Sequence, residues 1–178
     1  MRLKEKYQKE IIPALIKKFN YENPAGVPKV KKVTVNVGIN SARNDAKFLD
    51  AMENVLERIT GQKPVKCRAK KSVSNFKIRE GMVVGMKVTL RGQRMYDFLE
   101  KLIAIALPRV RDFRGISKKN VDEAGNLNIG FKEYTSFPEI NADEVEHMHG
   151  LEVSITTNAE TKEKGEELFK LLGFPFKD

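Results

Sequence analysis

The chain of 178 residues contains a single cysteine and no tryptophan. One thiol, Cys67, excludes an internal disulfide and predicts a reducing compartment, which for a basic protein means the cytoplasm or nucleus. The longest unbroken apolar run, Leu102 to Leu107, is far shorter than the roughly 20 residues that cross a bilayer. Because residues 1–10 are charged and lack an apolar centre, we expect neither a signal peptide nor a membrane partner.

Acidic side chains are nearly absent from one stretch of the chain. Between Lys63 and Arg91 there are nine basic side chains and one acidic one, so this segment supplies +8 of the net charge of +9. Like charges at this density repel one another unless a polyanion neutralises them. The segment also alternates like a strand, which would hold the cations in a fixed array. This combination favours nucleic acid as the partner.

Hydrophobic periodicity predicts helices interleaved with strands. Apolar stripes predict helices over 3–19, 45–60, 92–107 and from about Ala159 onward. Pro13 is expected to bend the first helix or to start a second one. Alternation predicts strands over 33–37, 65–69, 84–91 and 151–156, and a turn between short strands at 122–126.

This order of elements predicts an α+β fold in two layers. The sheet is expected to be mostly antiparallel, with the helices packed on one face and an open basic face on the other. The length and the absence of internal repeats favour one domain over 1–178, with a long basic loop at about 70–82.

The polar positions of three strands are expected to share the open face: Lys32, Thr34, Asn36, Lys66, Arg68, Lys87, Thr89 and Arg91. A solvated sheet face is the commonest explanation of such alternation. That explanation is weaker here because solvated faces normally mix charges of both signs. The other positions of the second strand, Val65, Cys67 and Ala69, are expected to face the core, which would make Cys67 a buried, inert thiol.

The open face is expected to recognise folded RNA by its shape. None of the outward positions is aromatic, so bases are not expected to stack on the sheet. Phosphates and 2′-hydroxyls suit cations mixed with the hydrogen-bonding side chains of Asn36, Gln62 and Thr89. These residues alone leave DNA open as an alternative.

The loop from Lys71 to Met82 is longer than a hairpin requires. Long loops tend to be functional or disordered. A solvated charge run is one interpretation, and the apolar Phe76 and Ile78 favour the other, in which the loop docks on a partner. The sequence leaves both open.

No catalytic or cofactor site is expected. Lys70, Lys71 and Ser72 lack the preceding glycine of a phosphate-binding loop. His147 and His149, with the carboxylates near them, have a spacing that points two ligands in different directions, so no metal is expected. The protein is therefore predicted not to be an enzyme.

Separated blocks of the sequence carry a family resemblance: Val35 to Gly38, Thr60 to Pro64, Lys71 to Ser72, Asn75 to Gly81, Lys87 to Gly92, Pro108 to Gly115, Phe137 to Ile140, Ile155 to Thr157 and Gly173 to Phe176. Through these blocks the chain resembles, along its whole length, the bacterial form of the fifth large-subunit ribosomal protein family. The resemblance implies a structural role in the cytoplasmic ribosome without enzyme activity or cofactor. An RNA chaperone or other non-specific RNA-binding module is the alternative.

The resemblance also implies partners and sites. It implies binding to 5S rRNA through the face with Asn36, Gln62 and Thr89, and attachment of that RNA in the central protuberance, beside 23S rRNA and neighbouring large-subunit proteins. It implies that a loop contacts the peptidyl-site tRNA through Lys70, Lys71, Ser72, Ser74, Asn75, Phe76, Lys77 and Arg79. A contact to small-subunit ribosomal protein thirteen is implied through the later loops, where Asn141 and His147 to His149 depart from the family pattern.

Overall fold

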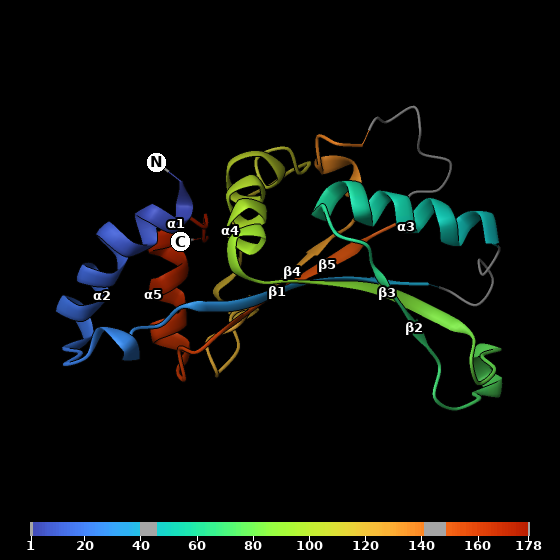
Figure 1. Ribbon diagram of the computed structural model, residues 1–178, viewed down its shortest axis with the longest axis horizontal. Helices are drawn as coiled ribbons and strands as arrows, with labels where there is room; N and C mark the ends of the chain where they lie inside the picture. The colour runs from blue at the N-terminus through green and yellow to red at the C-terminus, as the bar shows by residue number, and fades with distance from the viewer. Residues whose placement is uncertain (1, 40–45, 141–148, 178) are drawn as a thin grey trace. The chain divides into compact units, whose positions relative to one another are not determined.

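The computed structural model describes residues 2–39, 46–140 and 149–177. Within them, five antiparallel strands form one open sheet in the order β2-β3-β1-β5-β4 (Figure 1). The strands are β1 Val30–Gly38, β2 Val65–Arg68, β3 Val83–Leu90, β4 Leu127–Phe131 and β5 Leu151–Thr157. The α-helices are α1 Leu3–Lys6, α2 Ile12–Phe19, α3 Ala46–Thr60, α4 Gly92–Lys101 and α5 Lys162–Leu172. The predicted α+β class is confirmed.

The chain forms two compact units. The first comprises residues 1–33, 91–129 and 154–178, and the second comprises residues 34–90 and 130–153. Strands β1, β4 and β5 each contain a boundary between the units. The expectation of a single domain over 1–178 stays a prediction.

In the first unit, the amino-terminal helix is divided by a π-helical turn that precedes Pro13. A π-helical turn at Tyr7–Ile11 separates α1 from α2, and Pro13 lies in the first turn of α2. Proline has no N–H for the preceding turn and its ring crowds the carbonyl four residues earlier, so a wider turn is accommodated here. The Tyr7 hydroxyl donates to the Pro28 carbonyl at 3.0 Å. Burial, with a smaller effect of Tyr96, raises the pKa of Tyr7 to about 12, so this donor stays protonated.

Helix α5 of the first unit packs closely on the turn at 122–126. Thr161 caps its amino end by accepting from the backbone N–H of Lys164. Gly125 in the turn has a φ of +79°, and a Cβ added at Gly165 would lie 2.5 Å from the Gly125 Cα. The Asp122 carboxylate accepts from the backbone N–H of Asn126 at 2.7 Å. The predicted turn is therefore confirmed, and glycine on both sides permits the close approach of the two backbones.

In the second unit, α3 packs against β3 and lies on one side of it (Figure 1). The residues that α3 buries are Met52, Leu56 and Ile59, and those that the strands bury are Val35, Val37, Met86, Val88 and Leu90. The helix ends where predicted, because Gly61 takes a φ of +68° and donates its N–H to the Glu57 carbonyl. The core side of β1 and β3 is thereby fixed by their alternate apolar residues.

Replacement of Gly165 by alanine tests the contact between α5 and the turn. Alanine gains about 1 kcal/mol of helix propensity over glycine, whereas forcing a methyl against backbone costs about 1–3 kcal/mol. Because Gly125 backbone atoms cannot rotate away as a side chain would, we expect a net loss of up to about 2 kcal/mol in the free energy of unfolding. Urea denaturation measures it, with Lys170→Ala on the exposed side of the same helix as control. A Gly165→Ala variant more stable than the native chain would contradict the packing.

Candidate nucleic-acid interface

Strands β1 and β3 bring four predicted site residues to one side of the second unit. These strands are neighbours in the sheet, and Ile39 extends their pairing by donating its backbone N–H to the Val84 carbonyl at 2.9 Å. Since alternate residues of both strands are buried against α3, the intervening residues face the other side. These are Thr34, Asn36, Lys87 and Thr89, of which Asn36 and Lys87 are exposed and both threonines are half-buried. We call this side the polar face.

The side chain of Gln62 is hydrogen-bonded to the backbone of β3 beside the polar face. Its side-chain amide donates to the Thr89 carbonyl at 3.2 Å. The hydroxyl of Thr60 donates to the Leu56 carbonyl at 2.7 Å and accepts from the Gln62 backbone N–H at 3.3 Å. Gln62 is therefore held both to Thr60 and to β3, and it lies next to Thr89 as the predicted site requires.

One carboxylate lies beside these strands. Glu152 of β5 is exposed and alternates with the buried Leu151 and Val153. Within β1 and β3 of the second unit, the polar face has one cation, Lys87, and no acid. Its chemistry is that of uncharged hydrogen-bonding groups with a single ammonium, and it is less cationic than the sequence predicts.

The prediction that Lys66 shares a face with Lys87 is wrong. In the antiparallel pairing of β2 with β3, Val65 lies opposite Lys87 and Lys66 lies opposite Met86. Residues directly opposite each other project to the same side of a sheet. Lys66 therefore shares the side of buried Met86, which is the side of α3.

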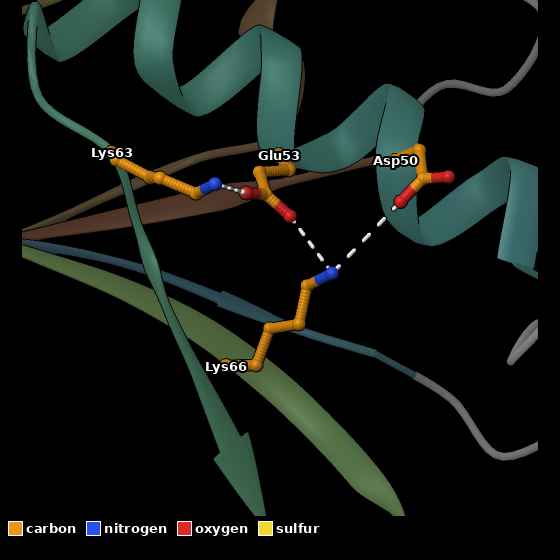
Figure 2. A network of polar contacts seen from close by, with 4 residues as sticks. All are labelled: Asp50, Glu53, Lys63 and Lys66. Carbon is orange, nitrogen blue, oxygen red and sulfur yellow. Dashed lines mark ion pairs between the residues drawn. The ribbon is translucent and has the colours of Figure 1, made fainter.

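Lys66 forms ion pairs with carboxylates on α3. Its Nζ lies 2.8 Å from Glu53 Oε2 and 3.9 Å from Asp50 Oδ1, and Lys63 Nζ lies 3.1 Å from Glu53 Oε1 (Figure 2). The hydrogen bond from Lys66, and then that from Lys63, lowers the pKa of Glu53, and the same bond raises the pKa of Lys66. Both shifts favour the charged forms of Glu53 and Lys66. Sequence reasoning missed Asp50 and Glu53, although carboxylates three residues apart on a helix before a basic strand were a usable signal.

The apolar residues of β2 turn outward as a consequence. Val65 is 62 % exposed, and Cys67, which pairs with Gly85, is half-buried on the side of Lys87. The expectation that Val65 and Cys67 face the core is wrong. Strand β2 lies at the edge of the sheet, with Lys66 beside the α3 carboxylates and Val65 on the opposite side.

Of the remaining predicted strand cations, one has no defined side and two belong to the first unit. A bulge follows Cys67, so that Arg68 pairs with Val83 and its side no longer follows from alternation. Lys32 and Arg91 belong to the first unit, where Lys32 is half-buried and Arg91 is exposed.

The basic loop is built by its own hydrogen bonds. Val73 and Ile78 exchange two backbone hydrogen bonds of 2.9 and 3.1 Å, which close a short turn over 74–77. The Ser72 hydroxyl accepts from the Glu80 N–H at 2.9 Å. The predicted contact residues are all exposed, namely Lys70, Lys71, Ser72, Ser74, Asn75, Phe76, Lys77 and Arg79. Phe76 is 69 % exposed, so an aromatic ring and several cations project from a defined turn.

Other kinds of site find little support. In the described ranges there is no cluster of three histidine, cysteine or carboxylate side chains suited to a metal. His149 stacks on Tyr134 with ring centroids 4.2 Å apart, whereas Asn141 and His147 lie outside the described residues. No described helix combines the length and apolar character needed to span a membrane.

Comparison with known proteins agrees with a ribosomal role. Residues 23–79 match the family model described as ribosomal protein L5, and residues 83–176 match the model of the carboxyl terminus of the same ribosomal family. The chain is 56 % identical over 174 residues to the large ribosomal subunit protein uL5 of Halothermothrix orenii, covering 98 % of this chain and 97 % of that protein. The chain therefore belongs to the ribosomal protein L5 family.

Proposed function

We propose that this structural, non-catalytic component of the cytoplasmic large ribosomal subunit binds 5S rRNA through the polar face. The observation that carries the proposal is the grouping of Thr34, Asn36, Lys87 and Thr89 on one side of β1 and β3, with Gln62 fastened to Thr89. Amide and hydroxyl groups at fixed spacing suit the 2′-hydroxyls and base edges of a folded RNA, and Lys87 supplies a phosphate contact. Bound in this way, the RNA is held to the central protuberance, with 23S rRNA and other large-subunit proteins as neighbours.

The low charge of the polar face favours a specific site over a non-specific RNA chaperone. Non-specific binding depends almost entirely on cations and phosphates. A face with one ammonium and several uncharged groups gains more from hydrogen bonds, which depend on the position of each partner.

The basic loop is the second part of the proposal. We propose that its turn over 74–77 contacts the peptidyl-site tRNA, with Lys77 and Arg79 on phosphates and Phe76 against a ribose or base. Its internal hydrogen bonds support this role, because a pre-formed loop loses less conformational entropy on binding than a flexible one. The contact to small-subunit ribosomal protein thirteen is proposed for the later loops, part of which lies outside the described residues.

Removal of single hydrogen-bonding groups tests the polar face. Asn36→Ala and Thr89→Val each remove about 0.5–1.5 kcal/mol of hydrogen bonding, so the affinity for 5S rRNA should fall roughly threefold to tenfold. Binding to a scrambled RNA of equal length should hardly change. Asn54→Ala, an exposed asparagine on α3, is the control. Equal losses for both RNAs would favour the chaperone function instead.

Lys87 is expected to act differently from its uncharged neighbours. Removing one phosphate contact reduces the slope of log affinity against log salt by about 0.7–0.9. Lys87→Ala should therefore lower the slope for 5S rRNA, and Asn36→Ala should leave it unchanged. Fluorescence titrations between 50 and about 300 mM salt measure both slopes. A slope that Lys87→Ala does not alter would place this lysine outside the interface.

The loop is tested separately from the face. Ribosomes carrying Lys77→Ala with Arg79→Ala should release peptidyl-site tRNA several times faster, because two charge-assisted contacts are lost. The same variant should retain full affinity for free 5S rRNA. If this variant lost 5S rRNA binding and left tRNA release unchanged, the roles proposed for the polar face and the basic loop would be wrong.

A further inference from the structure

Glu53 forms ion pairs with two of the cations in the basic segment from Lys63 to Arg91. Its side chain is only 15 % exposed, and its two oxygens lie within 3.1 Å of the ammonium groups of Lys63 and Lys66 (Figure 2). No other carboxylate in the described residues lies within 4 Å of Lys63, and Lys66 has only the more distant Asp50 besides. Glu53 is therefore the main counter-charge for both lysines.

The other cations of the segment have no such partner. Among the described residues of the second unit, no ion pair is found for Arg68, Lys70, Lys71, Lys77, Arg79 or Lys87. The segment thus has two classes of cation, one paired with carboxylates of the protein itself and one available to an external anion. The pairing with Met86 puts Lys66 on the α3 side of β2, away from Asn36 and Thr89.

We propose that Glu53 is a specificity-determining residue for the RNA binding proposed above, on which this inference rests. By holding Lys63 and Lys66, Glu53 keeps phosphates from engaging the edge of the sheet on the α3 side, where no amide or hydroxyl of the polar face can read them. Phosphate contacts there would be independent of sequence and shape. Their suppression raises the preference for the RNA that fits the polar face.

A purely structural role predicts the opposite outcome. Exposed ion pairs contribute little to folding, and a Glu53 that only braced β2 would, when removed, weaken binding to every RNA. A specificity role predicts that its removal strengthens binding to the wrong RNA. The sign of the change separates the two roles.

Glu53→Gln in the full chain is the test, with 5S rRNA and a scrambled RNA of equal length as probes. Two released lysines should steepen the salt slope for the scrambled RNA by about 1.4–1.8. The affinity ratio of variant to native chain for that RNA should then fall roughly 25- to 60-fold between about 20 and about 200 mM salt. The affinity for 5S rRNA should change less. The ratio of the affinity for 5S rRNA to that for the scrambled RNA should therefore decrease.

Two further variants make the result decisive. Glu57→Gln changes the net charge equally on the same helix, but Glu57 has no ion pair among the described residues, and it should leave the slope unchanged. Adding Lys63→Gln and Lys66→Gln to Glu53→Gln should restore the native slope. An unchanged slope in Glu53→Gln, an equal effect of Glu57→Gln, or failure of the lysine changes to restore the slope would overturn the proposal.

The outcome is separable from that of the proposed function. If the native chain does not prefer 5S rRNA over the scrambled RNA, the proposed function fails. The slopes on scrambled RNA still report whether Glu53 withholds two lysines from phosphate. Circular dichroism melting of each variant confirms that the compared proteins are folded.

Discussion

Burial of alternate side chains in β1 and β3 is the constraint on which the rest of the second unit depends. Val35, Val37, Met86 and Val88 are buried on the side of α3. The residues between them must therefore project to the opposite side of the sheet. Asn36, Lys87 and Thr89 are therefore brought together by the hydrophobic effect acting on their neighbours. The recognition groups need no attraction to one another to share a face.

Strand β2 differs from β1 and β3 because a charged residue, Lys66, and not an apolar one lies on its α3 side. The strand has a partner on one edge alone, and its Val65 is 62 % exposed. Lys66 lies beside two carboxylates on α3, and Val65 projects to the opposite side. The net charge of the segment thus overstates the charge that a polyanion meets, because part of it is already neutralised by the protein.

The success of sequence reasoning follows the same division. Elements with a strong apolar stripe, such as α3 and β3, were predictable because their own residues specify which side is buried. In β2, alternation distinguishes two sides but does not say which faces inward, and the carboxylates that pair with Lys66 lie on another element. The defined turn in the basic loop could not be predicted either. It depends on backbone hydrogen bonds between Val73 and Ile78, and the residues between them show no apolar pattern. Strand β4 was indicated only as a short strand beside the turn at 122–126.

The outward turn of β2 has a consequence for the sole thiol of the chain. Cys67 shares the side of Lys87 and is half-buried, so its sulfur lies where a large ligand on that side would cover it. The rate at which a neutral alkylating reagent modifies the native protein therefore reports on the accessibility of Cys67 alone, because the chain has no other thiol. The orientation of an edge strand thus places a natural site for chemical labelling beside the proposed RNA contact.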